Sequence, residues 1–509
     1  MKKPVQQWMR LARCRWLFLA GVFTLATLYL TAFPTRLYGQ ESTPPPAPST
    51  VERKNRAPIS RDILRVKLPR PVEAKLKNGM TVLILEDHRF PLVFVQLRIG
   101  GAGALFEPAK ISGLANVTAQ MLREGTKSRS SRQIAEEIDR LGATVGAASD
   151  FGSTETSFSA SGLTDNFDDW FSLAVEILLR PTFPSDELEK LKQRLRAQLR
   201  QQRASPNFLV SERFNRVVYG DHPAAVVSPT QISVDALTSE DLTNWHRERY
   251  APQNMILGIA GNVRAAELTA KLESWFGGWR KSNVKQQLPP PPVAAKAPRV
   301  SLIDRPNSVQ TTVALGNIAI DRRSPDYFAM VVMNRILGGG PAARLFLNLR
   351  EEKGYTYGVY SNFTAVQYPG PWRAGGNMRT EVTAPAVVEF FNEIRRMRDE
   401  KVTAAELEEN KRAIAASFAL SLEQPTQILG FAIASKVYGF PADYWDSYPA
   451  KVMAVTIDDV QRVARKYLNP GAMQLVAVGD ANRIKEGLEK YGAVEVYNTE
   501  GHPVVTPKP

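Results

Sequence analysis

The sequence predicts an α+β protein, of the α/β sandwich type, that consists of two homologous halves. Segments with helical and with strand periodicity alternate along the chain. Short motifs also recur at a nearly constant offset: Glu187-Leu188-Glu189 returns as Glu406-Leu407-Glu408, and Val218-Tyr219-Gly220 as Val437-Tyr438-Gly439, both 219 residues on. A proline run within residues 285–299, Pro289–Pro292, favours a semi-rigid linker between the repeats. A duplicated unit on either side of a linker explains all three observations.

The composition is that of a globular chain with a large core. Of the 509 residues, 44% are hydrophobic and 23% are charged. The net charge is +14, and six of the positive charges precede residue 41, which leaves +8 for residues 41–509. So modest an excess favours a scattered, solvated surface over a site for an acidic partner or for membrane headgroups, and no nucleic-acid-binding motif occurs. The one cysteine, Cys14, leaves the rest of the chain without disulfides.

Residues 1–40 resemble a secretory signal. Basic residues precede an apolar run from Trp16 to Phe33. At about 18 residues the run is long for a signal and just long enough to span a bilayer. Both cleavage near Gly39 and retention as a membrane anchor are open, and either places the body outside the cytoplasm, in the periplasm or on the membrane. Residues 41–68 read as a Pro/Ser-rich tether.

The first half is expected over residues 69–284. Its predicted elements are strands at 81–85, 89–99, 144–149 and 154–161, and helices at 112–125, 131–142, 164–179 and 185–202. Ser112 and Ser185 are the expected N-caps of their helices. The second half is expected over residues 300–495, followed by a tail at 496–509.

The predicted helix from Ser112 carries polar side chains on one face. Leu114, Val117, Met121 and Leu122 fall at helical spacing and would face a core, while Asn116 and Gln120, four residues apart, share another face. The sequence around them, Gly113-Leu114-Ala115 before and Met121-Leu122-x-x-Gly125-Thr126 after, resembles the active-site helix of the zinc peptidases related to pitrilysin, insulysin and mitochondrial processing peptidase.

The resemblance places a degenerate zinc site on this helix. In that family the same frame encloses His-x-x-Glu-His; here Asn116 and Gln120 stand at the histidines and Ala119 at the glutamate. The family's third ligand, a glutamate, corresponds to one of the residues Arg196 to Gln198, with Ala197 at the centre, and no Asp or Glu occurs from Lys190 to Ser211. Neutral amides are poor zinc ligands, and without a carboxylate nothing local takes a proton from a metal-bound water. The resemblance therefore implies no metal and no catalytic residue in this chain alone.

A second stretch, Leu337–Val359, also resembles the family. A glycine turn, Gly338, Gly339 and Gly340, leads to Arg344-Leu345-Phe346, then Arg350 and, seven residues on, Tyr357. In relatives this arginine and tyrosine hold the substrate backbone and its developing oxyanion, a role that suits guanidinium and phenol donors. The alternative is that Arg350 pairs with Glu351 or Glu352 while Tyr357 is the core of a strand. No GK[ST] follows the glycines, so a phosphate loop is disfavoured.

The resemblance implies two halves with antiparallel-rich sheets that enclose a cleft for extended or unfolded peptides. Family members of this length often work as two chains, one carrying zinc and the other lending the arginine and tyrosine. We therefore expect the non-catalytic, substrate-binding subunit of a heterodimeric metalloendopeptidase, with zinc on a homologous partner and contact with a membrane only through the N-terminal segment. The alternatives are a scaffold or peptide-binding module without a role in proteolysis, and a lone active zinc endopeptidase. His88, His222, His246 and His502 are scattered and form no metal pair, and a surface or helix-end position is expected for His246.

Overall fold

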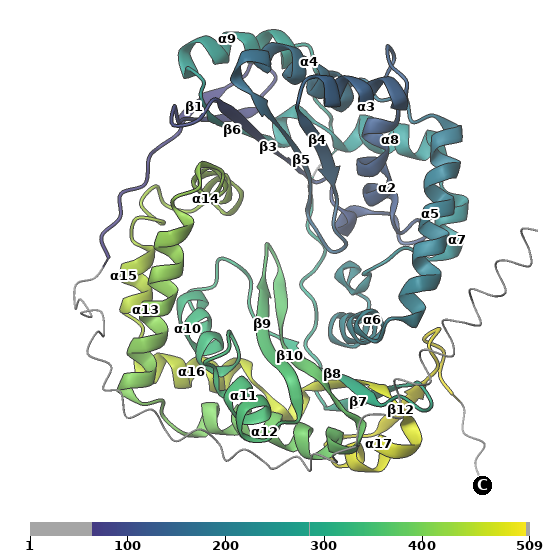
Figure 1. Cartoon of the computed structure of the whole chain (residues 1–509), viewed down its shortest axis with the longest axis vertical. Helices are drawn as coiled ribbons and strands as arrows, with labels where there is room; N and C mark the ends of the chain where they lie inside the picture. The colour runs from purple at the N-terminus through teal and green to yellow at the C-terminus, as the bar shows by residue number, and fades with distance from the viewer. Residues whose placement is uncertain (1–63, 285, 505–509) are drawn as a thin grey trace, which may run out of the picture. The chain divides into compact units, whose positions relative to one another are not determined.

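The computed structural model describes residues 64–284 and 286–504, which lie in one unit, Asp62–Pro509. The described strands form two six-stranded sheets, shown in Figure 1. The first sheet has the order β1 (Val72–Lys75), β2 (Thr81–Glu86), β6 (Met255–Gly261), β3 (Leu92–Gly100), β5 (Glu155–Leu163), β4 (Thr144–Ala148). The second has the order β12 (Val494–Tyr497), β7 (Arg299–Asp304), β11 (Gln474–Gly479), β8 (Gln310–Ile318), β10 (Pro369–Arg379), β9 (Thr356–Ala365).

The two sheets have the same construction except at one edge, where β1 pairs antiparallel with β2 but β12 pairs parallel with β7. In each, two central strands run parallel, β2 with β6 and β7 with β11, and the strands from there to the β4 or β9 edge pair antiparallel. The expected α+β class, the antiparallel-rich sheets and the two homologous halves are thus confirmed. The expected strands and helices of the first half are all present, with ends shifted by a few residues.

Helices follow the strands in matching order in both halves. The first half contains α2 (Leu114–Met121), α3 (Ser131–Arg140), α4 (Phe167–Leu179), α5 (Ser185–Ala204), α6 (Pro206–Tyr219), α7 (Gln231–Ala236), α8 (Ser239–Arg249) and α9 (Ala265–Phe276). The second contains α10 (Tyr327–Leu337), α11 (Arg344–Phe346), α12 (Thr383–Asp399), α13 (Ala404–Ser421), α14 (Pro425–Tyr438), α15 (Tyr448–Met453), α16 (Ile457–Tyr467) and α17 (Ala481–Leu488).

One core lies between each sheet and its own helices. In β3 every second residue is buried, so Val93, Val95, Leu97 and Ile99 face the helices of the first half. Residues from β7, β8 and β11 do the same against α10, α12 and α16. The period of two in the strands and of about 3.6 in the helices is what allows a sheet face to meet helix stripes.

The halves exchange one helix each across the unit. Helix α6 of the first half packs on the second sheet, where Leu209, Phe214 and Val218 meet residues of β7, β8 and β11. Helix α14 of the second half packs on the first sheet: Leu429 and Ile433 lie so close to Gly258 of β6 that a Cβ there would stand 2.9 and 2.8 Å from their side chains. Both exchanged helices begin with a proline at their first turn, which ends the preceding long helix and allows a new direction.

Two expected N-caps are wrong. Helix α2 begins after Gly113, whose φ of 95° is a left-handed conformation that glycine adopts readily, and the Ser112 hydroxyl bonds Ser233 Oγ at 3.1 Å instead. Helix α5 is preceded by Pro184 in an extended conformation, so Ser185 is its first residue and does not cap it. Asp186 and Glu187 in the first turn still offset the helix dipole.

The ends of the halves can be located from packing. Leu68, expected in the tether, is 4% exposed and packs with Trp445 and Leu429 of the second half. Residues 286–298 form neither helix nor strand, and β12 runs to Tyr497, two residues beyond the expected end of the second half. The predicted signal or anchor, residues 1–40, lies outside the described residues. In the described ranges, none of the helices has the length and apolarity needed to cross a membrane.

Candidate functional site

Helix α2 lies beside β4, the edge strand of the first sheet. The Asn116 side-chain amide donates to the carbonyl of Ser149, directly after this strand, at 3.0 Å. Farther along, the Arg123 guanidinium donates to the carbonyl of Val145 at 3.1 Å. These two hydrogen bonds fix the edge strand and the helix to each other. The space beside Gly146 of β4 is open, since a Cβ built there would have no atom within 4 Å.

The positions that correspond to zinc ligands bind each other. Gln120 Nε2 donates to Asn116 Oδ1 at 2.6 Å. Gln120 is exposed, Asn116 is partly buried, and Ala119 turns its methyl group into the core with 1% exposure. Ala197 is exposed on α5 and offers no donor atom. These residues do not fit a zinc ion, which needs imidazole, thiolate or carboxylate ligands.

The acidic, histidine and cysteine side chains of the described ranges are scattered. Within residues 64–284 and 286–504, no three or more His, Cys, Asp or Glu side chains lie together so that they could hold a metal ion. His222 and His246 each pack against two aromatic rings instead.

A partly buried glutamate, Glu107, stabilises the start of α2. The Glu107 carboxylate accepts from the backbone N–H groups of Gly113 at 2.8 Å and Ala115 at 2.6 Å, which are among the donors that a helix N-terminus leaves without partners. Burial raises the pKa of Glu107 to about 7, although these two hydrogen bonds oppose the increase. Glu107 thus takes the place that Ser112 was expected to have.

Arg350 and Tyr357 lie together in the second half. Arg350 belongs to a π-helical turn, Leu347–Glu352, an element often found at functional sites, and Tyr357 lies at the start of the edge strand β9. The guanidinium carbon of Arg350 is 5.2 Å from the centroid of the Tyr357 ring and 4.8 Å from that of Phe346. Tyr357 is 89% exposed, so its interpretation as strand core is wrong. The ion pair that was expected as the alternative role of Arg350 is present, since Arg350 pairs with Glu351 at 3.4 Å.

The glycine turn packs directly on β9. The carbonyl of Gly338 accepts from the N–H of Ser361 at 2.8 Å, and a Cβ on Gly338 would come within 2.5 Å of the Ser361 side chain. Arg335 Nη1 donates to the carbonyl of Gly339 at 2.9 Å. The close approach of the two backbones therefore explains why residue 338 is a glycine. On the same strand, the side chains of Tyr357 and Tyr360 are exposed.

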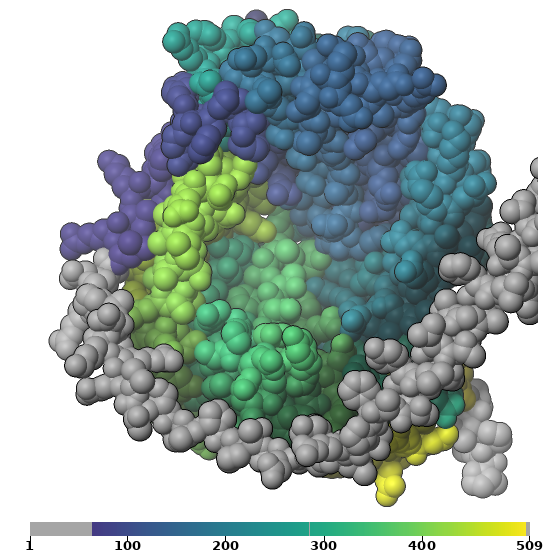
Figure 2. All heavy atoms as spheres, in the orientation of Figure 1, coloured from purple at the N-terminus to yellow at the C-terminus, as the bar shows by residue number. Residues whose placement is uncertain are grey.

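The predicted site residues form two groups, one in each half. In the described chain no hydrogen bond or ion pair joins Asn116, Gln120 or Ala197 to Arg350 or Tyr357. The halves do meet beyond the end of β9, where the Tyr368 hydroxyl donates to the carbonyl of Gly152 at 2.6 Å. Figure 2 shows this face of the unit hollowed between the blue surface of the first half and the green surface of the second.

Sequence reasoning missed two polar residues of this region. Glu107 has a local signal, an acidic residue shortly before a helix whose first residues lack a capping side chain. Arg322 is buried among aromatic rings, yet in the sequence it is one charge in Asp321-Arg322-Arg323, typical of a solvated loop. Nothing local marks it, because most of its aromatic neighbours lie more than 100 residues away.

Comparisons with known proteins agree with the fold. Residues 81–226 match the model of insulinase (peptidase family M16), and residues 236–414 match that of the peptidase M16 inactive domain; together they take in more than half of the chain. An uncharacterized zinc protease of Bacillus subtilis, YmxG, is 24% identical over 349 residues, which is 68% of this chain and 83% of that protein.

Solved structures match over most of both chains. A peptidase M16 inactive domain from Pseudomonas fluorescens has a TM-score of 0.75 at 28% identity, over 81% of this chain and 98% of that one. A protease from Helicobacter pylori has a TM-score of 0.74 at 20% identity, over 81% and 100%, and shows the shared fold. The duplicated sheets, the framed helix and these matches lead to one conclusion: the chain belongs to peptidase family M16, the family of pitrilysin and insulinase.

Proposed function

We propose that this chain is the non-catalytic, substrate-binding subunit of a two-chain metalloendopeptidase, paired with a zinc-bearing homologue. The hydrogen bond between Gln120 and Asn116 is the main support for the proposal. It shows two neutral amides bound to each other at the positions where a working member of the family needs zinc ligands. The solved relative from Pseudomonas fluorescens is likewise described as an inactive domain.

Arg350 and Tyr357 would be what this chain contributes to the pair. Arginine has five N–H donors, and the ion pair with Glu351 leaves several of them available. The phenol of Tyr357 is exposed and can donate to a peptide carbonyl or to an oxygen that becomes negative during attack. Aiming two donors at one oxygen is the usual way to stabilise such a charge.

The edge strands offer a way to bind extended peptide. Strand β4 has β5 on one side, and β9 has β10 on one side. An edge strand presents N–H and C=O groups that an extended peptide can pair with, in the manner of an added strand. Because that pairing uses backbone groups, it suits unfolded or extended substrates of varied sequence. Export to the periplasm, or anchoring by residues 1–40, is part of the same proposal.

The test is reconstitution with a family member of similar length that has an intact His-x-x-Glu-His. Arg350→Ala and Tyr357→Phe are expected to lower turnover of a quenched peptide by at least about tenfold while the two chains still elute together. Arg483→Ala is the matched control, since Arg483 is exposed on α17, at the opposite edge of the second sheet, and should leave turnover unchanged.

The result separates the possible roles. If both variants support full turnover, Arg350 and Tyr357 have no part in catalysis, and a scaffold or peptide-binding role remains. If this chain alone cleaves the peptide at the rate of the pair, the proposal of a non-catalytic subunit is wrong.

A further inference from the structure

A pocket in the second half combines aromatic walls with cations. It lies among α10, α13, α14 and α15 and has a volume of about 380 Å³. That volume is at the small end of the range of roughly 300 to 1,000 Å³ that is typical of small-ligand sites. We name it the arginine–aromatic pocket after the residues that define it: Arg322, Tyr327, Arg335, Phe418, Trp445 and Tyr448.

Arg322 is a buried cation. It is 8% exposed, and its guanidinium carbon lies 3.7 Å from the centroid of the Tyr327 ring and 4.8 Å from that of Phe440. Its Nη1 donates to the hydroxyl of Tyr444 at 2.8 Å. Buried charges are normally paired with an opposite charge, yet Arg322 makes no ion pair with any residue of the described ranges. Rings cover the faces of a stacked guanidinium and leave its edge for a planar anion.

Arg335 adds a second cation to the same pocket. One of its nitrogens donates to the carbonyl of Gly339, and within residues 64–284 and 286–504 it also forms no ion pair. Lys451 lies 4.6 Å from the centroid of the Tyr444 ring, on the same aromatic cluster. The nearby carboxylate of Glu155 is already paired with Arg98 at 3.3 Å. The positive charge of the pocket is therefore not balanced locally.

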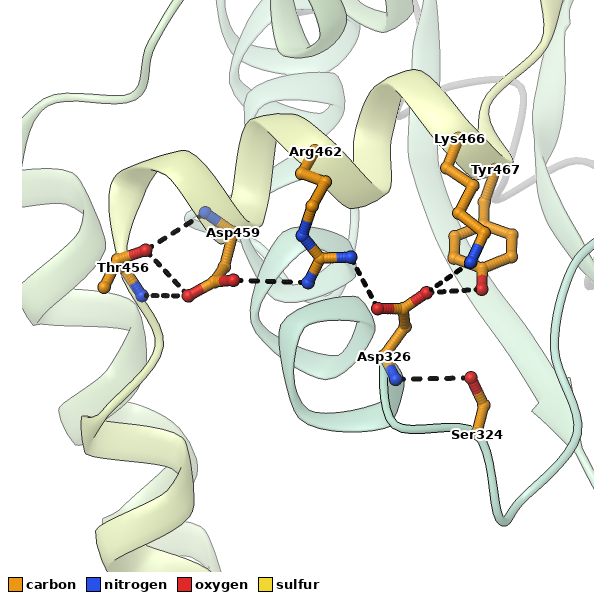
Figure 3. Close-up of polar contacts among 7 residues, drawn as sticks. All are labelled: Ser324, Asp326, Thr456, Asp459, Arg462, Lys466 and Tyr467. Carbon is orange, nitrogen blue, oxygen red and sulfur yellow. Dashed lines mark hydrogen bonds and ion pairs between the residues drawn. The ribbon is translucent and has the colours of Figure 1, made fainter.

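The loop that carries Arg322 is fixed by hydrogen bonds to α16. Figure 3 shows Asp326, four residues on, between the side chains of α16: it accepts from Arg462 at 2.6 Å, Lys466 at 2.8 Å and Tyr467 at 2.6 Å. Its own N–H donates to Ser324 Oγ at 3.2 Å. A loop fixed in this way loses little conformational entropy when a ligand binds, so Arg322 is preorganised.

The pocket lies along the edge strand that carries Tyr357. Phe363 of β9 meets Tyr327 of the pocket, with ring centroids 5.9 Å apart. Phe363 lies six positions after Tyr357, a distance of about 20 Å along the strand at roughly 3.3 Å per residue. An extended peptide that follows β9 would therefore bring one of its residues to the pocket. A peptide has two kinds of group for a cationic, aromatic-lined pocket: its terminal carboxylate and its acidic side chains.

We propose that the arginine–aromatic pocket binds a peptide carboxylate next to an apolar side chain, with Arg322 and Arg335 on the carboxylate and the aromatic rings on the apolar group. The carboxylate can belong to a C-terminus or to an Asp or Glu side chain. This inference goes beyond the proposed function, since binding requires neither zinc nor a partner chain. Its failure would leave the roles of Arg350 and Tyr357 untouched.

The experiment measures fluorescence anisotropy of labelled peptides with the full chain. The probes are Ala-Ala-Ala-Ala-Ala-Phe with a free C-terminus, the same peptide as the C-terminal amide, and an amide in which Glu precedes Phe. The free acid, the Glu amide or both are expected to bind at least about tenfold more tightly than the plain amide. Tight binding of the free acid would identify a C-terminal carboxylate as the ligand, and tight binding of the Glu amide would identify a side-chain carboxylate. Equal binding of all three probes would overturn the proposal.

Matched variants locate the binding. Arg322→Gln and Arg335→Gln should each lower affinity for the acidic probe at least about tenfold, whereas Arg323→Gln, the same change on the exposed neighbour, should not. Ser417→Trp on α13 fills the pocket and should block binding, while Ala416→Trp, also exposed but outside the pocket, should not. If Arg322→Gln fails to fold, Arg335→Gln and Ser417→Trp decide. Native affinity in both of these variants would contradict the site.

Discussion

The side-chain amide of Gln120 donates a hydrogen bond of 2.6 Å to the side-chain carbonyl of Asn116, one turn earlier in α2. Asn116 in turn donates to the carbonyl of Ser149, so the chain of bonds runs from the helix to the end of the edge strand β4. A face that would hold a metal in a zinc peptidase is here a small network of neutral amides. It ties the helix to the sheet and requires no ion.

Restoring the imidazoles should restore metal binding in part. Residues 116 and 120 share a helix face, so Asn116→His with Gln120→His places two zinc ligands at the spacing of i and i+4. We expect the double variant to bind zinc at least about tenfold more tightly than the native chain in calorimetric titration. Gln120→His alone is the control and should behave as the native chain. Unchanged binding in the double variant would mean that the backbone there differs from a working site.

The exchanged helices should keep the halves together without the linker. Phe214 of α6 is 1% exposed in the second half's core, and Leu429 of α14 is 0% exposed against the first sheet. If a specific protease site is inserted within Pro289–Pro292 and cut, we expect the cut protein to elute as one species in gel filtration. In denaturant the two fragments should separate. Two smaller species in native buffer would show that the helix exchange does not hold the halves together.

His246 should make stability depend on pH. It lies in the last turn of α8, partly buried, and its Nε2 donates to the carbonyl of Leu178 at 2.8 Å. Burial lowers the pKa of His246 to about 4. Below pH 6.5 the unfolded chain takes up a proton that the folded chain excludes, so stability falls as the pH falls. From pH 7 to pH 5 the loss should be about 2 kcal/mol.

The His246→Gln variant isolates this effect. Glutamine can still donate to the carbonyl of Leu178 but does not titrate. The free energy of unfolding of the variant, measured in urea, should therefore fall less between pH 7 and pH 5 than that of the native chain. Parallel pH profiles for the two proteins would contradict the lowered pKa.

The Asp326 carboxylate should stabilise the fold more than a carboxylate in an exposed ion pair does. Burial would raise its pKa, but hydrogen bonds from Lys466, Tyr467 and Arg462 outweigh that effect and hold the pKa well below its usual range. Asp326→Asn removes the charge that faces two cations, and we expect a loss of about 2 kcal/mol in the free energy of unfolding at pH 7.

The control for Asp326→Asn is a second aspartate, Asp458, on the helix α16 whose side chains bind Asp326. Asp458 pairs with Lys401 at 2.7 Å, but its side chain is 77% exposed. Asp458→Asn should therefore change stability by less than about 0.5 kcal/mol. Equal losses for the two variants would mean that burial of Asp326 adds nothing.

Much of the fold was predictable from the sequence because its signals are local. Alternation of apolar residues marks β3, and capping residues, prolines and glycines mark the ends of elements. The repeated motifs predict that the second half copies the first. The exchange of α6 and α14 was not predictable. Helix α6 has an apolar stripe, whereas the apolar residues of α14 lie on all its sides, and neither pattern says which sheet the helix will meet.

The site was predictable only where a motif preserved it. The framing residues around Asn116 and the spacing of Arg350 and Tyr357 pointed to their positions, and the structure brings the latter two together. The arginine–aromatic pocket was not predictable. Tyr327, Phe440 and Tyr444 surround Arg322 only after α10 and α14 have packed, and in the sequence Arg322 is one of several charges in a loop, a pattern typical of solvated residues.

The most direct test of the central claim is the zinc content of the purified full chain, measured by elemental analysis after dialysis against trace zinc, alongside cleavage of a quenched peptide library. Because amides stand where ligands are needed, we expect zinc well below one per chain and no cleavage. Zinc held near one per chain together with cleavage would show that this chain is itself a working metallopeptidase and would contradict the account.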